Sequence, residues 1–582
     1  MTGYGPHVLR EYALLADGER GALVGPSGDL SWLCFPRWDS GSVFATLVGG
    51  RSSYVVAPIG RHVWGGYYEP GSLIWRNRWV TDHGIVECRD ALRYPAESDR
   101  VVLLRRITAI GGPAAMQVEL RPRSDYDRHP LTDLHQHHGV WTGRVGDLHL
   151  RWSSGTGARS RDNGELLQLR LELQPGESHD LVLELASGQL DGELPPPDEM
   201  WRGTETAWQH AVPPLRNCVA PKDTRHSYAV LRGLTGASGG MVAAATTSLP
   251  ERSEAGRNYD YRYVWIRDQS YAGLAAAAAG TEPLLDAAVR FVSARLLEHG
   301  DRLAPAYTMA GRPIPDQRHI GLPGYPGGYD IIGNRVVEQF QLDAFGEALL
   351  LLAAAGGRDR LEVEHWKAAE IAAAAIEKRW QEPDAGIWEI DDRPWTHSRL
   401  TAAAGLRAIA AAAPRTPTAI GWLSLADRII ADTDRSSLHP SGRWQRSPED
   451  PQVDGALLLP GLRGAVPPDD PRSVATLQAY LTDLTQDGYA YRFRHDQRPL
   501  AEAEGSFLLC GFLVALSLHQ LGRHTEARGW FERTRTACGP PQLLSEEFDP
   551  QQHQLRGNLP QAFVHALLLE ASVRLADGDR TS

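Results

Sequence analysis

The sequence predicts a protein of two domains, an antiparallel β-sandwich followed by a larger helical domain. From about Asp29 to Gly188, short runs of β-branched and aromatic residues are broken by Gly, Pro and Asp. Beyond a proline-rich stretch, the chain becomes rich in alanine and leucine, with apolar residues three and four positions apart. The 582 residues leave room for two to four domains at roughly 150 residues each.

The strands of the first domain are predicted from these short runs, and two of the runs also show a period-2 pattern. The segments LLQLRLEL and DLVLEL alternate apolar with polar residues, as strands do when one face is buried and the other faces water. No long helical pattern interrupts the series, so a β-sandwich is the simplest architecture. The expected strands are SSYVVAP, SLIWRNRWV, GIVECRDALRY, RVVLLRRITAI, AAMQVELRPR, DLHLRWSS, LLQLRLELQ and HDLVLELAS.

A domain boundary is predicted near residue 215. The segments GELPPPDEMWRG and VPPLRNCVAPKD are rich in proline and charge, and the texture of the sequence changes after them. We therefore expect a β-sandwich domain with its linker over residues 1–215 and a helical domain over residues 216–582.

The second domain is predicted to contain about a dozen helices, including two around His226–Leu234 and Asp454–Leu462. No fixed-period repeat favours a solenoid. The loops are long, and long loops on a helical scaffold usually carry function. One of them, GLPGYPGGYD at residues 321–330, matches no nucleotide-binding motif and is expected to contact substrate.

Composition argues against several functional classes. Sixty basic and 72 acidic residues give a net charge of −12, which provides no general attraction to nucleic acid or anionic lipid. No run of about 18 apolar residues could span a bilayer. The first residues lack the apolar segment of a secretory signal. We therefore expect a cytoplasmic protein with neither nucleic acid nor a membrane as partner.

Neither a metal nor a cofactor is expected. The five cysteines are scattered and form no CxxC pair, which argues against a zinc ribbon and a disulfide framework. The segment LHQHHG places His135 and His137 on one strand face and His138 opposite, without a further ligand at metal-binding spacing. The sequence carries no signal for an oligomeric state.

Four clusters in the helical domain combine aromatic, arginine and carboxylate side chains, the mixture that a sugar site needs. Each also has an ordinary explanation: a helix N-terminus, a strand with a surface glutamate, an ion pair between Arg492 and Glu504, or a solvated acidic face. The clusters are NYDYRYVWIRD (258–268), PDAGIWEIDDRPWTHS (383–398), GYAYRFRHDQRPLAEAEGSFLLC (488–510) and LLSEEFDP (543–550).

In this order, NYDYRYVWIRD, GIWE, YRF…EGSFLLC and LLSEEFDP…GNLPQAF resemble glycoside hydrolase family 15, the family of glucoamylases, glucodextranases and microbial trehalases. The opening EYALLADGERGALVGPSGDLSW and the segment IIGNRVVEQFQLDAFGE are similar to that family too, so the resemblance covers nearly the whole chain. It implies a β-sandwich followed by an (α/α)6 barrel. It also implies an inverting, exo-acting hydrolase that releases β-glucose from the non-reducing end of a small α-glucoside, such as trehalose, isomaltose or a short malto- or isomalto-oligosaccharide.

The resemblance implies two catalytic carboxylates, with Glu389 similar to the family's general acid and Glu546 to its general base. Inversion needs room for a water between acid and base, with about 6.5–9.5 Å between the carboxyl groups. The acid must stay protonated while the base stays ionised. We therefore expect Glu389, beside Trp388, to be drier, and Glu546 to lie closer to arginine and water.

The resemblance also implies a set of sugar-binding residues. Arg267 and Asp268 match the pair that grips the non-reducing glucose, and Glu547 stands where the glucoamylases carry glutamine. The full set of expected binding residues is Tyr261, Trp265, Arg267, Asp268, Trp388, Arg492 and Glu547.

Two alternatives come from other functional classes: a catalytically inactive carbohydrate-binding protein of the same fold, and an α-glucoside phosphorylase. Loss of either catalytic carboxylate would favour the inactive protein, but both Glu389 and Glu546 are retained. A phosphorylase does not need a base that activates water, so Glu546 argues against that activity. A small carbohydrate is the expected ligand in every case.

Overall fold

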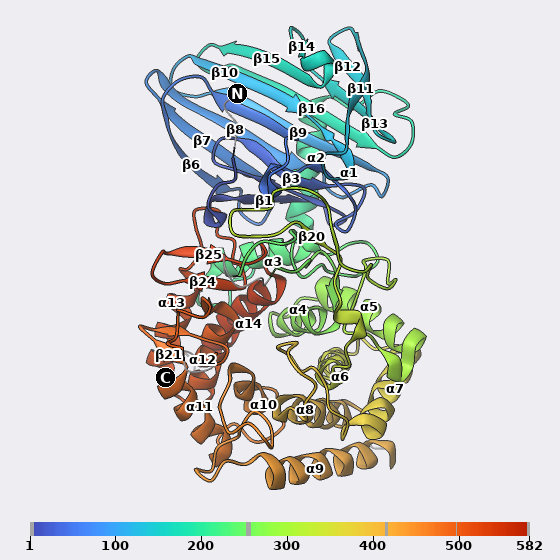
Figure 1. Ribbon diagram of the computed structural model, residues 1–582, viewed down its shortest axis with the longest axis vertical. Coiled ribbons are helices and arrows are strands. Elements are labelled where there is room, and N and C mark those ends of the chain that lie inside the picture. Colours follow the sequence, from blue (N-terminus) through green and yellow to red (C-terminus); the bar gives the residue numbers. More distant parts are fainter. Residues whose placement is uncertain (1–4, 252–257, 414–416, 496–497, 579–582) are drawn as a thin grey trace.

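The computed structural model describes residues 5–251, 258–413, 417–495 and 498–578. Antiparallel β-sheets form one end of the molecule, and the helices form the other (Figure 1). The predicted order, antiparallel sheets followed by a helical region, is confirmed.

Two eight-stranded sheets make up the β-region, and all their strand pairs are antiparallel. Their apolar faces share one core that includes Tyr54, Trp75, Trp79 and Trp152. The strands of the first sheet are β1 Ala13–Ala16, β2 Gly21–Val24, β3 Asp29–Cys34, β4 Ser42–Phe44, β5 Ser53–Pro58, β10 Ala114–Arg121, β14 Arg159–Arg161 and β15 Leu166–Leu173. Those of the second are β6 His62–Tyr68, β7 Trp75–Thr81, β8 Gly84–Leu92, β9 Arg100–Ala109, β11 His129–His137, β12 Val140–Val145, β13 Leu148–Ser153 and β16 Ser178–Ala186.

Two strands precede Asp29, where the strand-like texture of the sequence begins. Strands β1 and β2 pair in antiparallel register, with Ala13 opposite Val24. Every residue of both strands is buried. Their sequences, ALLA and GALV, therefore carry none of the apolar–polar alternation seen in LLQLRLEL and DLVLEL.

The proline-rich stretch contains a helix, α2 (Pro197–Ala211), where a linker was expected. Two tryptophans of α2 pack against the β-region. Trp201 donates to Asp180 in β16 at 3.1 Å, and Trp208 stacks on Tyr94, which follows β8. A proline at the first helical position suits a helix N-terminus, where its missing N–H has no partner to lose. Proline-rich sequence here begins a helix.

The helical region follows α2, and both additional helices expected near residues 226–234 and 454–462 are present. Each of α4, α6, α8, α10, α12 and α14 contacts the next in this series, and α14 contacts α4. The helices are α3 Pro221–Leu234, α4 Ile266–Ala278, α5 Pro283–His299, α6 Leu342–Gly356, α7 Val363–Arg379, α8 Thr396–Ala412, α9 Pro417–Ser437, α10 Leu459–Leu462, α11 Pro471–Asp483, α12 Leu508–Gln520, α13 His524–Arg535 and α14 Ala562–Gly578, besides the one-turn α1 Ser124–Asp127 in the β-region.

Helices α6 and α8 pack with their backbones in close approach. A side chain at Gly346 would lie 2.5 Å from the carbonyl oxygen of Thr401, and one at Gly405 would lie 2.4 Å from that of Gly346. Only glycine therefore fits at either position. The loops that precede these two helices carry residues of the site, so the close packing fixes their spacing.

No helix in the four described ranges combines the length and apolar character of a membrane span.

Candidate active site

A cavity of about 510 Å³ opens among the loops of the helical region and contains most of the predicted residues. Its volume is in the range of small-ligand pockets, about 300–1,000 Å³. Aromatic and charged side chains line it together. Eight of the nine predicted site residues are among its lining: Tyr261, Trp265, Arg267, Asp268, Trp388, Glu389, Arg492 and Glu546.

Residues 259–262 alternate between cavity-lining and fully buried side chains. Tyr259 and Tyr261 line the cavity with their rings stacked at 6.3 Å. The intervening Asp260 and Arg262 are fully buried. Extended backbone sends successive side chains to opposite sides, so a single short segment serves both surfaces.

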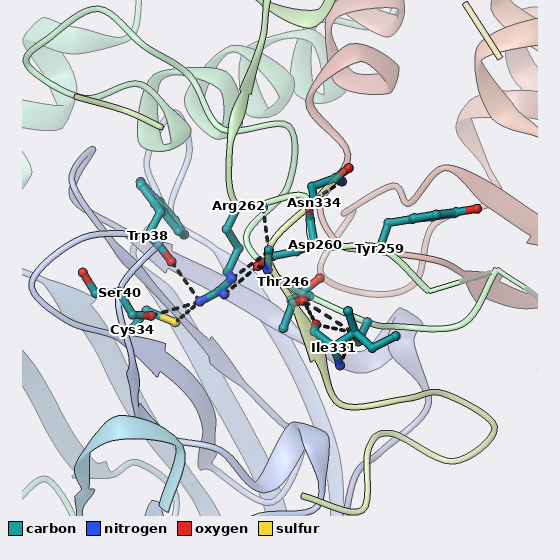
Figure 2. Close-up of polar contacts among 12 residues, drawn as sticks. Cys34, Trp38, Ser40, Thr246, Tyr259, Asp260, Arg262, Ile331 and Asn334 are labelled. Carbon is teal, nitrogen blue, oxygen red and sulfur yellow. Dashed lines mark hydrogen bonds and ion pairs between the residues drawn. The ribbon is translucent and has the colours of Figure 1, made fainter. Parts of the chain in front are cut away.

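Arg262 anchors this segment to the β-region (Figure 2). Its guanidinium donates to the carbonyl oxygens of Ser40 (3.0 Å) and Trp38 (3.3 Å) and to the sulfur of Cys34. It also pairs with Asp260, whose carboxylate accepts from the backbone N–H of Gly333. The β-region thus helps to hold Tyr259 and Tyr261 at the cavity wall.

Arg267 and Asp268 lie in the first turn of α4 and line the cavity. Arg267 donates to Gln341 (2.9 Å) and Glu389 (3.1 Å) and pairs with Asp343. Asp268 is buried, and its Oδ1 has no hydrogen-bond partner among the described residues. Burial, with a contribution from the charge of Glu389, raises the pKa of Asp268 to about 7. A helix N-terminus alone does not explain such a carboxyl group inside a cavity.

Glu389 sits in a turn rather than in the short strand that was an alternative for its cluster. Gly386 and Glu389 have φ angles of 64° and 54°, in the left-handed region that turns use. The Oε1 atom of Glu389 accepts from the indole of Trp265 (2.9 Å), from Arg267 (3.1 Å) and from Gln341 (3.2 Å). Its side chain stays 25% exposed. One oxygen is therefore held by three donors on a side chain that still reaches solvent.

Glu546 is buried and lies just before strand β24 (Glu547–Asp549). Its Oε2 accepts the hydroxyl of Tyr261 at 3.2 Å. Burial and the negative charge of Glu251 raise the pKa of Glu546 well above its usual range, while Arg492 opposes this rise. The solvated acidic face that was an alternative for LLSEEFDP is therefore wrong.

The expected environments of the two carboxylates are reversed in the structure. Glu389 was expected to be the drier group, yet it is only partly buried, whereas Glu546 is buried. The reason is position: Glu389 lies in a turn, but Glu546 leads into the three-stranded sheet β23–β24–β25, in which Phe507 also lines the cavity. Strands β23 and β25 span Ser506–Phe507 and Gln554–Arg556.

Glu251 is a cavity residue that the sequence analysis missed. Its Oε1 lies 3.4 Å from the Tyr261 hydroxyl, and its Oε2 lies 3.5 Å from Arg492. It is buried at 5% exposure. Glu251 follows SLP and lies outside all four aromatic clusters, so no spacing signal in the sequence marked it.

Arg492 lines the cavity and also forms the ion pair with Glu504 that was the ordinary explanation of its cluster. Its guanidinium donates to both oxygens of Glu504 at 2.8–3.0 Å, between the rings of Phe493 and Phe507. Burial opposes ionisation of Glu504, but Arg492 and His495 lower the pKa of Glu504 to about 2. Glu504 thus fixes the position of a permanently charged arginine at the cavity wall.

Glu547 is not among the lining residues, so the structure does not bring it to the cavity with the others. It is fully buried, accepts the backbone N–H of Gly505 at 2.9 Å and lies 3.9 Å from Arg492. Neighbouring residues at a strand face opposite sides, which takes Glu547 away from the cavity that Glu546 lines.

Trp388 lines the cavity, but its indole donates to Asp454 at 3.1 Å. The indole that contacts the Glu389 carboxylate comes from Trp265 instead. Sequence proximity pointed to the wrong tryptophan, because the turn at Gly386 directs residues 388 and 389 to different partners.

The glycine-rich segment 321–330 does not line the cavity, which corrects its expected contact with substrate. It packs on the β-region: the N–H of Gly324 donates to Val48, and the hydroxyl of Tyr325 donates to the carbonyl of His7. The flanking residues Gln317 and Asn334 line the cavity instead.

In the same structure, His137 and His138 contact each other, and the described part of the chain holds no cluster of three or more potential metal ligands.

Two family models match this chain. The model of glycosyl hydrolases family 15 matches residues 226–573, and a model of the trehalase-like N-terminal domain matches residues 1–209. The chain belongs to glycosyl hydrolases family 15. It is therefore a glycoside hydrolase, and the family that its motifs resemble is confirmed.

This family 15 hydrolase is similar over nearly its whole length to two trehalases and to a solved glucoamylase structure. It is 30% identical to a trehalase of Mycobacterium tuberculosis, over 97% of this chain and 89% of the relative. A trehalase of Mycolicibacterium smegmatis is also 30% identical, over 97% and 91%. A bacterial glucoamylase complexed with acarbose shares the fold, with a TM-score of 0.73 at 14% identity over 98% of this chain and 95% of that structure.

Proposed function

We propose that this hydrolase cleaves trehalose, or a related small α-glucoside such as isomaltose or a short malto- or isomalto-oligosaccharide, with inversion at the anomeric carbon. The observation that carries the proposal is that Glu389 and Glu546, from separate loops, line one disaccharide-sized cavity. Trehalose comes first because the two relatives that are 30% identical over nearly the whole chain are trehalases.

Glu389 acts as the general acid in this proposal. Three donors already contact its Oε1, so a proton on this carboxyl group belongs on Oε2. From Oε2 it passes to the glycosidic oxygen as the bond from that oxygen to the anomeric carbon breaks. The three donors restrict rotation of the carboxyl group and keep Oε2 available to the substrate.

Glu546 acts as the general base. Its carboxylate removes a proton from a water while the oxygen of that water bonds to the anomeric carbon from the face opposite the leaving group. The Tyr261 hydroxyl at 3.2 Å holds this carboxylate in place. Inversion requires the carboxyl groups of Glu389 and Glu546 to be about 6.5–9.5 Å apart.

Six further lining residues bind the sugar. Arg267 supplies a guanidinium beside Glu389, and the unpartnered Oδ1 of Asp268 can accept a sugar hydroxyl. The aromatic rings offer flat apolar surfaces to the faces of a pyranose. We assign sugar contact to Tyr261, Trp265, Arg267, Asp268, Trp388 and Arg492.

We further propose that the helical region is an (α/α)6 barrel. The contacts that run in turn through α4, α6, α8, α10, α12 and α14 and return to α4 support an inner ring of six helices. A domain boundary near residue 215 is supported by its place between α2 and α3. The cavity then lies at one mouth of the barrel.

The test is release of glucose from trehalose, isomaltose, maltose and kojibiose, each with and without phosphate. Hydrolysis predicts free glucose without phosphate, and trehalose is expected to be the best substrate. A strict requirement for phosphate would identify a phosphorylase, and binding without release would identify an inactive carbohydrate-binding protein. Either outcome would overturn the proposed function.

A further inference from the structure

The hydroxyl of Tyr261 lies between two carboxylates, 3.2 Å from Oε2 of Glu546 and 3.4 Å from Oε1 of Glu251. A phenol has one proton and can donate it to one of them at a time. We propose that Glu251 is a positioning residue for the base: it accepts the Tyr261 hydroxyl when Glu546 takes up the proton of the attacking water. This inference rests on the proposed function, because it concerns the base of that reaction.

The backbone brings Glu251 and Glu546 together independently of Tyr261. A side chain at Gly557 would meet Cγ of Glu251 at 3.6 Å and Cβ of Glu546 at 3.7 Å, so both glutamates pack against the same glycine. The N–H of Gly557 donates to the carbonyl of Pro250 at 2.8 Å, which ties this turn to the residue before Glu251. The backbone therefore holds Glu251 and Glu546 side by side at the cavity.

The positive charge beside the pair is shared. Arg492 lies 3.5 Å from Glu251, but both oxygens of Glu504 accept from the same guanidinium at 2.8–3.0 Å. His495 also contacts Glu504, at 2.8 Å. The ion pair with Glu504 takes up much of the charge that could otherwise compensate Glu251 and Glu546.

Among the described residues, the charged groups that act on Glu546 besides Glu251 and Arg492 include the acidic Asp268. The charge of Asp268 adds to that of Glu251 in raising the pKa of Glu546, and Glu251 and Glu546 in turn raise the pKa of Glu547. Burial, followed by the charges of Glu546, Glu251 and Glu389, raises the pKa of the Tyr261 phenol. Tyr261 therefore keeps its proton and acts as a donor throughout.

The proposed step is balanced in bonds and protons. The water loses a proton to Glu546, its oxygen bonds to the anomeric carbon, and the leaving oxygen takes the proton of Glu389. Protonated Glu546 no longer needs the Tyr261 hydroxyl, which rotates to Glu251 without giving up its own proton. Glu251 thereby favours proton uptake by Glu546, both through its charge and as the alternative acceptor.

The pKa of Glu546 sets the acidic limb of kcat/KM in this proposal. Glu546 must be ionised, so activity falls as the pH drops through its pKa. A neighbouring carboxylate raises that pKa, and a hydroxyl donating to the carboxylate lowers it. Removing the Glu251 charge should move the acidic limb of kcat/KM to lower pH. Removing the Tyr261 hydroxyl should move it to higher pH.

The experiment compares the acidic limb of kcat/KM in wild type, Glu251→Gln, Glu251→Asp and Tyr261→Phe. We expect Glu251→Gln to shift the limb down by about one pH unit or more and to lower kcat, and Tyr261→Phe to shift it up. Glu251→Asp keeps the charge and should fall between wild type and Glu251→Gln. The control Glu364→Gln removes the same charge from the exposed first turn of α7 and should leave the limb in place.

A rise in KM for Glu251→Gln with an unmoved acidic limb would make Glu251 a sugar-binding residue and overturn the inference. Infrared difference titration of the Glu546 carboxyl, referenced to Glu546→Gln, measures the same shift without substrate or turnover. It therefore decides the inference even if wild type releases no glucose, an outcome that would count against the proposed function alone. Equal infrared midpoints in wild type and Glu251→Gln would also overturn the inference.

Discussion

The indole N–H of Trp265 donates to Oε1 of Glu389 at 2.9 Å, across 124 positions of sequence. Trp265 ends the two-residue strand β17 (Val264–Trp265), which pairs with β18 (Ala306–Tyr307). The proposed acid is therefore oriented by a residue on a paired strand, and not by the tryptophan next to it in sequence.

We expect Trp265→Phe to lower kcat by about tenfold or more, because Glu389 loses one of three donors that hold its Oε1. Steady-state kinetics on the best substrate measure this loss. Trp388→Phe is the matched comparison, since its indole donates to Asp454 and its removal leaves all three donors in place. An equal loss of kcat in both variants would contradict the orienting role of Trp265.

Glu389→Gln and Glu546→Gln should each lower kcat by about 10²–10⁴-fold and leave the fold intact, because each removes the acid or base of the transition state. Circular dichroism and thermal unfolding check the fold. Glu547→Gln, one residue along and outside the cavity, should cost far less activity. Near-normal turnover of Glu389→Gln or Glu546→Gln would show that the role assigned at that position is wrong.

Arg267→Ala and Asp268→Ala should raise KM and lower kcat together. Arg267 contacts Glu389 as well as lining the cavity, and Asp268 is a buried carboxyl group with an oxygen free for a sugar hydroxyl. Kinetics with trehalose measure both constants. Unchanged kinetics in both variants would instead support the simpler explanation that the pair only stabilises the N-terminus of α4.

The first glucose released by hydrolysis of an α-glucoside should be the β-anomer, because water enters opposite the departing oxygen in an inverting reaction. Proton NMR of the anomeric region in the first minutes, before mutarotation, distinguishes the anomers. Initial α-glucose would indicate retention and would remove the base role of Glu546.

Arg262→Ala should lower the free energy of unfolding by about 3–5 kcal/mol, because it leaves the buried carboxylate of Asp260 without its cation. It should also reduce activity, since Tyr261 is next in sequence and lines the cavity. Urea denaturation measures the stability change. Arg523→Ala, in an exposed pair with Glu526, is the control and should change stability by less than about 1 kcal/mol.

Much of the architecture could be predicted from local patterns. Strand β15 was predicted from its alternation of apolar and polar residues, and the alanine- and leucine-rich helices from apolar residues three and four positions apart. Strands β1 and β2 were missed because both of their faces are buried, which removes the alternation. Local periodicity reports exposure on one face, so it is silent where neither face meets water.

The sequence by itself determined which residue types are available for sugar chemistry, and its motifs in order were enough to indicate the family. Only the tertiary structure decided their environments: that Glu546 is more buried than Glu389, that Trp265 rather than Trp388 contacts the proposed acid, and that Glu547 lies outside the cavity. It also brought in Glu251, which no motif marked. The physical reason is that burial, hydrogen bonding and the electrostatic field at a carboxyl group depend on neighbours distant in sequence, and packing alone brings those neighbours into contact.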